Sequence, residues 1–130
     1  MATATAELLT AAQRGIAEAV IADTAAERYA RAHLSALRSA AAVLAARAQP
    51  SRGRSRLRSV WSVLPVVAPE LAEWSTFFAT SAGKRAAAEA GLPVVSQREA
   101  DDLLRDAEAF HDQVCTVLHV DRQQALPATG

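Results

Sequence analysis

The sequence predicts an all-α protein, an up-down bundle of four long helices with one additional short helix. Alanine supplies about a quarter of the 130 residues, and alanine loses no side-chain entropy when it enters a helix. Apolar residues recur at spacings of three and four in four long stretches, two of which begin with a capping box. Four amphipathic helices joined by short connections bury their apolar faces most completely as a bundle.

The first long helix is expected over about residues 5–22, and Gly15 is a weak position inside it. Its apolar stripe contains Leu9, Ala12, Ile16, Ala19 and Val20. The second helix is expected to begin at the capping box of Thr24 and Glu27 and to end at about residue 48, before Pro50. Its broad apolar face contains Tyr29, His33, Ala36, Leu37, Ala40, Val43 and Leu44. The polar face opposite contains Glu27, Arg31, Ser35 and Arg38.

The next segment, PSRGRSRLRS at residues 50–59, has no apolar period and is expected to be an exposed loop. Its alternating arginines are Arg52, Arg54, Arg56 and Arg58. Arginines in this arrangement can bind the phosphates of a nucleic acid. A solvated linker in an arginine-rich chain has the same composition, and no aromatic residue lies among the arginines to stack on bases. Both interpretations therefore stay open.

A short helix is expected over residues 60–67, with Trp61 and Leu64 facing inward. Pro69 suits the first turn of a fourth helix over about residues 70–90, which Gly91 stops. The apolar stripe of this helix contains Leu71, Trp74, Phe78 and Ala82. Phe77 lies off that stripe and is a candidate for a contact with a second subunit.

The last helix is expected over about residues 97–120, after the capping box of Ser96 and Glu99. Its core face contains Leu103, Ala107, Phe110, Val114, Val117 and Leu118. His119 is expected on the polar face. A single domain over residues 5–120, followed by a disordered tail over residues 121–130, is the predicted organisation.

The charge of the chain is unevenly distributed although its formal net charge is zero. Residues 1–58 contain nine arginines and four acidic residues, whereas residues 59–130 contain five basic and ten acidic residues. Such asymmetry can orient a partner or pair two subunits, or it can have no consequence.

Several classes of protein are not expected. Cys115 is the only cysteine, so no intramolecular disulfide can form. No secretory signal and no apolar run of about 20 residues is visible, so we expect a cytoplasmic protein without a membrane partner. The three histidines and the lone cysteine lack the spacing of a metal site, and no glycine-rich phosphate loop occurs. We therefore expect neither a metal nor a cofactor.

Three stretches resemble a known superfamily: ERYARAHLSALRSAAAVLAAR, SVWSVLPVVAPELAEWSTFFA and READDLLRDAEAFHDQV. They are similar to the HEPN superfamily of small helical bundles, named for higher-eukaryote and prokaryote nucleotide binding, and look like an actinobacterial subgroup of it. The likeness covers about residues 5–120. It implies a HEPN-like bundle that associates with RNA or nucleotides and forms a homodimer. The superfamily mixes active nucleases with inert relatives, so fold alone does not decide the function.

Active HEPN ribonucleases carry an arginine, a polar residue and, a few residues later, a histidine on the last long helix. Arg105, Asp106 and His111 in the stretch RDAEAFH match that pattern. The resemblance implies metal-independent RNA cleavage, with His111 as general base or general acid. It implies that Arg105 stabilises charge on the phosphate, and that Asp106 orients the pair.

Geometry and composition weigh against that site. His111 is expected near the edge of the apolar face, and Arg105 lies about 120° from it around the helix, so a joint site needs a second subunit or a bent substrate path. Five carboxylates surround Arg105 and would repel RNA phosphates: Glu99, Asp101, Asp102, Glu108 and Asp112. A second pair, Arg28 and His33, has similar spacing on the second helix, and His33 is interpreted as a core or interface histidine.

Two functions stay open. The first is a toxin-like, metal-independent endoribonuclease, for which the resemblance implies a nucleotidyltransferase partner. The second is a non-catalytic helical adaptor or dimerisation module, for which a DNA-repair protein is the expected partner. The adaptor predicts that replacing His111 affects stability alone.

Overall fold

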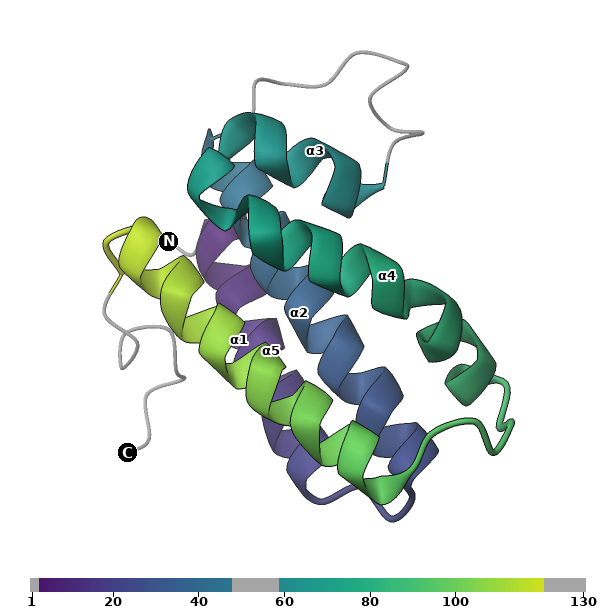
Figure 1. Cartoon of the computed structure of the whole chain (residues 1–130). Helices are drawn as coiled ribbons and strands as arrows, with labels where there is room; N and C mark the ends of the chain where they lie inside the picture. Colours follow the sequence, from purple (N-terminus) through teal and green to yellow (C-terminus); the bar gives the residue numbers. More distant parts are fainter. Residues whose placement is uncertain (1–2, 48–58, 121–130) are drawn as a thin grey trace, which may run out of the picture.

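The computed structural model describes residues 3–47 and 59–120, which form helices and short connections without a strand (Figure 1). The long helices are α1 (Ala4–Val20), α2 (Ala25–Arg47), α4 (Ala72–Glu89) and α5 (Gln97–Val117). The short helix α3 (Val60–Val67) and the 3₁₀ turn η2 (Pro69–Leu71) precede α4. The predicted all-α bundle is confirmed. Except for Ser59, the predicted arginine loop lies outside the described residues, as does the predicted tail over residues 121–130.

Side-chain caps set the first residues of α1, α2, α3 and α5. The Oγ1 atom of Thr3 accepts a hydrogen bond from the backbone N–H of Ala6 at 3.0 Å, and α1 begins there. At α5 the predicted capping box forms completely. The side chains of Ser96 and Glu99 each accept a hydrogen bond from the other residue's backbone N–H at 3.0 Å. These bonds satisfy N–H groups that have no partner inside the helix.

Two helices end in the same C-terminal motif. After α4, Gly91 takes a positive φ of 82°, and the N–H of Leu92 reaches back to the carbonyl of Ala87 at 3.1 Å. After α5, His119 takes a φ of 58°, and the N–H of Val120 bonds the carbonyl of Cys115 at 2.8 Å. This left-handed cap terminates helices. The expected extension of α5 to residue 120 is therefore wrong, and His119 lies exposed beyond the helix instead of on its polar face.

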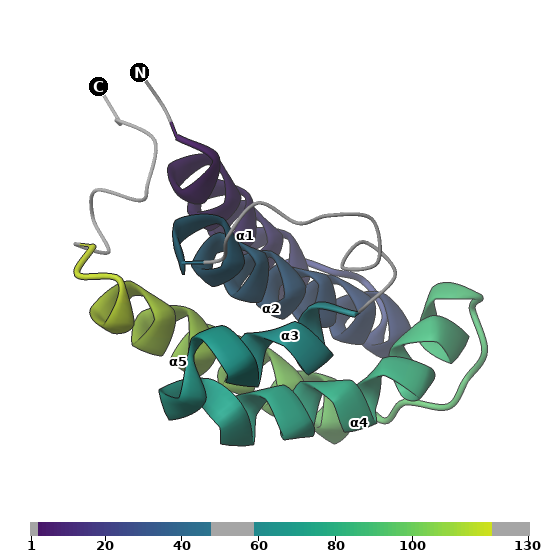
Figure 2. The same ribbon diagram turned by 90° about the horizontal axis from the view of Figure 1, so that it is seen from above.

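α2 is the central helix, because it packs against α1, α3, α4 and α5 (Figures 1 and 2). Buried residues consequently occupy more of its circumference than its apolar face indicates. Ser35, expected on the polar face, is fully buried, and its hydroxyl donates to the carbonyl of Ala12 at 2.7 Å. That expectation is wrong because α1 covers this side of α2. Val20, expected in the apolar stripe of α1, is instead 53% exposed.

α1 and α2 approach each other closely at Gly15. A Cβ atom at this position would lie 3.2 Å from the Cβ of Ser35. Glycine, which the sequence suggested only as a weak point in the helix, thus allows close contact between the two helices.

An aromatic cluster fills the space between α2, α3, α4 and α5. The ring of Phe78 lies at its centre, with ring centroids 5.2 Å from Trp61, 5.2 Å from Phe110 and 5.8 Å from Trp74. Phe78 and Phe110 are fully buried, whereas Trp74 is only partly buried. α4 and α5 make few direct backbone contacts, so these rings bridge the two helices.

The close contact at Gly15 predicts opposite outcomes for two glycine substitutions. Alanine is favoured over glycine inside a helix by about 1 kcal/mol. At Gly83 in α4 an added Cβ meets nothing within 4 Å, so Gly83→Ala should raise the free energy of unfolding by about 0.5–1 kcal/mol. Gly15→Ala should lower it, because Ser35 is held by its bond to Ala12 and cannot move away. Urea denaturation measures both, and an equal gain in the two variants would contradict the contact.

Candidate functional site

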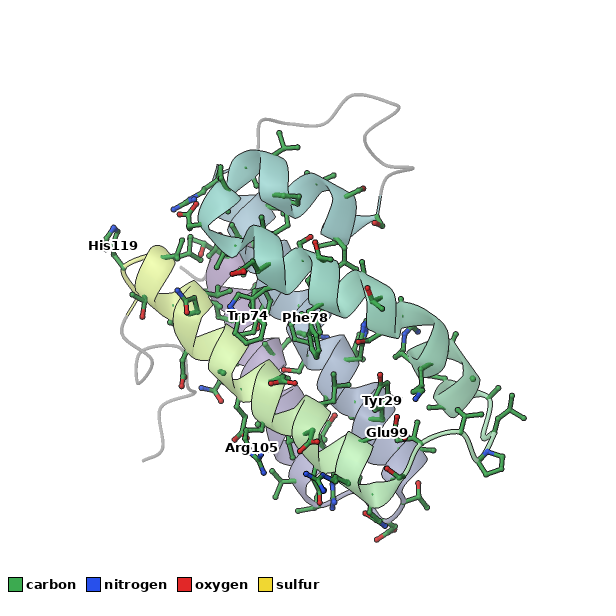
Figure 3. The ribbon with its side chains drawn as sticks, viewed as in Figure 1. Tyr29, Trp74, Phe78, Glu99, Arg105 and His119 are labelled. Atoms are coloured by element: carbon green, nitrogen blue, oxygen red, sulfur yellow. The ribbon has the colours of Figure 1, made fainter. Side chains whose placement is uncertain are left out.

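The three residues of the predicted catalytic set lie in different environments on α5, and Figure 3 labels Arg105 among them. The side chain of Arg105 is 77% exposed, and its Nη1 lies 3.6 Å from a carboxylate oxygen of Asp102. Asp106 is half-buried and lines a groove toward α4. His111 is fully buried, with its Nδ1 3.8 Å from the Sγ of Cys115. One subunit therefore offers no common surface on which Arg105 and His111 both contact a ligand.

The expected position of His111 at the edge of the apolar face is wrong. Both α1 and α2 pack on α5, so the covered arc of this helix is wider than its apolar stripe. His111 and Cys115 fall inside that arc and are buried together. The packing role expected for Cys115 agrees with its 3% exposure. The catalytic roles of Arg105, Asp106 and His111 stay a prediction.

The second arginine–histidine pair has a structural role. Arg28 donates to the last carbonyls of α1, at 3.0 Å to Ala19 and 3.2 Å to Val20, and its Nη1 lies 2.8 Å from Asp101 on α5. One guanidinium thus satisfies the end of α1 and joins it to α5. Sequence reasoning missed this role, although an arginine in the first turn after a short connection is suitably placed to reach back.

His33 is a core histidine, as the sequence predicted. Its Nε2 lies 2.9 Å from the carbonyl oxygen of Phe78, and its ring meets Trp61 and Phe78 edge-on. A neutral imidazole with its proton on Nε2 donates to that carbonyl. Burial lowers the pKa of His33 below its ordinary value of 6.5, and the positive charge of Arg85 acts in the same direction. The histidine is therefore neutral in the folded protein near pH 7.

A groove separates α4 from α5, and sequence reasoning did not find it. One part encloses about 420 Å³ and is lined by Glu70, Glu73, Trp74, Phe77, Asp106 and Gln113. A second part of about 310 Å³ is lined by Tyr29, Phe77, Ser81, Glu99, Asp102, Leu103 and Asp106. Phe77 and Asp106 line both parts, so the two hollows adjoin, and together they are called here the α4–α5 groove. Its only signal in the sequence was Phe77, which lies off the apolar stripe of α4.

The charge of the α4–α5 groove is negative. Burial raises the pKa of Asp106, and the neighbouring carboxylate of Asp102 raises it further against the opposing effect of Arg105. Glu70 is paired with Arg47 at 2.9 Å, and Glu99 is paired with Lys84. Such a surface disfavours phosphate groups and favours cations.

Residues 3–47 and 59–120 contain no group of three or more side chains placed to hold a metal ion. Within the same ranges, no helix is both long and apolar enough to span a membrane.

The all-helical order of the elements around a central α2 agrees with a HEPN-type bundle, the class that the sequence resembles. The chain belongs to the SAV_6107-like HEPN family, whose model matches residues 19–115, from the end of α1 to the last turn of α5. As a HEPN domain it is a nucleotide- or RNA-associated protein in the general sense of that superfamily. No curated protein and no solved structure gives a significant match.

The buried, neutral His33 predicts that the protein loses stability in mild acid. The unfolded chain binds a proton as the pH falls through about 6.5, whereas the folded chain binds it only at the lower folded pKa. Neutral His33 therefore makes its full contribution to the free energy of unfolding above pH 6.5. This contribution is lost as the pH falls from 6.5 to the lower pKa of the folded protein. Urea unfolding at about pH 7.5 and about pH 5.5 measures the loss.

The control for this prediction is His33→Gln, whose side-chain amide keeps a donor near the Phe78 carbonyl but does not titrate. Its stability should change less over the same pH interval. Equal losses in the two proteins would show that His33 does not cause the pH dependence.

Proposed function

We propose that this protein is a non-catalytic HEPN adaptor, which forms a homodimer and docks a partner protein instead of cleaving RNA. The observation that carries the proposal is the burial of His111, whose exposed fraction is 0%. Proton transfer requires the imidazole to approach the ribose hydroxyl to within about 3 Å. A fully buried ring offers no such approach in the folded chain.

The surface around Arg105 supports the same proposal. Asp101, Asp102 and Asp112 are exposed on α5, and Asp102 lies beside the Arg105 guanidinium. Carboxylates at this density weaken the attraction between a single arginine and an RNA backbone. Arg105 is consequently better suited to an ion pair at a protein surface than to the transition state of a phosphoryl transfer.

The exposed apolar side chains support a role in protein contacts. They lie at the end of α1, on α2, on α3, on α4 and in the connection before α5: Val20, Ile21, Leu34, Val66, Phe77, Leu92 and Val94. Each of these side chains leaves apolar surface that a partner protein could cover. HEPN domains often dimerise, and a homodimer of this chain is part of the proposal. A DNA-repair protein is the further partner that the resemblance implies.

A metal-independent endoribonuclease of toxin–antitoxin type is the second candidate. The spacing of Arg105, Asp106 and His111 on α5 favours it, because it matches the pattern of active HEPN ribonucleases. It requires a rearrangement that exposes His111. Arg52, Arg54, Arg56 and Arg58 lie outside the described residues, so contact between these arginines and a nucleic acid stays a prediction, as does a nucleotidyltransferase partner.

An RNA-cleavage assay in EDTA separates the two candidates. Labelled total tRNA and an unstructured RNA are incubated with the wild type, with Arg105→Ala and with the control Arg98→Ala. Both arginines are exposed on α5, at 77% and 91%, so neither change should disturb the fold. The adaptor proposal expects no cleavage by any of the three proteins.

The contrary result is equally specific. If the wild type and Arg98→Ala release products with 2′,3′-cyclic phosphate ends while Arg105→Ala does not, then Arg105 acts in catalysis. The adaptor proposal would then be wrong.

A further inference from the structure

The α4–α5 groove is open because the two helices that form it are held apart. Both helices pack on α2, but they make few backbone contacts with each other. Rings from α4 and α5 meet beneath the groove, with the centroids of Trp74 and Phe110 5.4 Å apart. The lining residues of α4 run from Ser81 back through Phe77 to Glu73, and Glu70 of η2 lies beyond them.

The length of the groove suits a peptide segment better than a small molecule. Glu70 and Ser81 are eleven residues apart, and a rise of 1.5 Å per residue places them about 16 Å apart along the helix axis. An extended peptide advances about 3.3 Å per residue. A segment of about five residues would therefore span the groove.

Aromatic rings form the apolar part of the lining. Phe77 is 40% exposed, and its ring lies edge-on to Trp74 with the centroids 6.4 Å apart. An exposed phenylalanine beside a partly buried tryptophan leaves apolar surface in contact with water, at a cost that a docked ligand would remove. Ring faces also attract cations, and tryptophan does so most strongly.

The charged side chains that line the groove favour a positively charged ligand. The described residues that line the groove include five acidic side chains and no basic one: Glu70, Glu73, Glu99, Asp102 and Asp106. Glu70 and Glu99 are already paired with Arg47 and Lys84. Glu73 and Asp106 have no ion pair within residues 3–47 and 59–120. The raised pKa of Asp106 reflects burial and the repulsion from Asp102, and a cation in the groove would relieve both.

The geometry points to the α4–α5 groove as a docking site for an arginine-containing segment of a partner protein, with a guanidinium over Phe77 and between the carboxylates of Glu73 and Asp106. A guanidinium stacks on an aromatic face and donates in its own plane to carboxylates, which a lysine ammonium does less well. This inference rests on the proposed adaptor function and names the chemistry of the partner.

The experiment measures peptide binding to the purified full chain. A fluorescein-labelled nine-residue peptide of alternating arginine and alanine is the probe, and a peptide with glutamate in place of arginine is its control. Fluorescence anisotropy at about 0.1 M salt gives the Kd. The expected result is saturable binding of the arginine peptide, no binding of the glutamate peptide, and a change in tryptophan fluorescence from Trp74.

Matched variants locate the binding site. Phe77→Ala and Asp106→Asn should each raise the Kd about fivefold or more, because each removes one of the three contacts to the guanidinium. Glu108→Gln, on the same helix but outside the groove lining, makes a comparable loss of charge and should leave the Kd unchanged. Circular dichroism checks that all three variants stay folded.

Three results would overturn the inference. The first is no binding of the arginine peptide at concentrations up to about 1 mM. The second is binding that Phe77→Ala and Asp106→Asn leave unchanged. The third is a different occupant of the groove, while no peptide binds. This occupant would be an RNA oligonucleotide, or a second copy of the chain detected by sedimentation, whose binding Phe77→Ala abolishes. RNA cleavage in EDTA would instead overturn the adaptor function, whether or not the arginine peptide binds. Failure of the docking inference and failure of the adaptor function are therefore distinguishable.

Discussion

The packing of Phe78 holds four helices of this protein in their relative positions. Its ring from α4 stacks against Trp61 of α3 and contacts Phe110 of α5, and its carbonyl accepts the hydrogen bond of His33 from α2. Burial of a phenylalanine ring contributes roughly 2–3 kcal/mol. Because α4 and α5 scarcely touch through their backbones, the rings around Phe78 set the distance between them. The α4–α5 groove is thus a consequence of the same cluster that completes the core.

A second constraint is the central position of α2. Four helices cover it, and small residues let them approach, as Gly15 does beside Ser35. The same compact arrangement surrounds α5 on two sides and encloses His111. A residue that the HEPN pattern marks as catalytic is here part of the packing, while Arg105 of the same pattern extends into solvent. The surface that stays open carries carboxylates and aromatic rings, which are suited to binding a basic partner.

Local signals predicted the helices well because their causes are local. The capping residues Ser96 and Glu99, the stop at Gly91 and the apolar spacing around Trp61 all act within a few residues along the chain. The end of α5 was placed too late because a left-handed histidine at position 119 gave no signal in the sequence. Helix periodicity also cannot reveal how many neighbours cover a helix, and for this reason Ser35 and His111 were expected to be less buried than they are. The α4–α5 groove depends on the distance between two helices, which no spacing within one helix encodes.

The burial of His111 is the central claim, and deuterium exchange at the C2–H of each imidazole tests it directly. Mass spectrometry of the full chain at neutral pH, with and without added RNA, measures the three histidines in one sample. His119 is exposed and His33 is buried, so they provide the fast and slow references. The account predicts that His111 exchanges as slowly as His33, and that RNA does not change its rate. Exchange as fast as that of His119 would show that the imidazole reaches solvent, and would contradict the non-catalytic account.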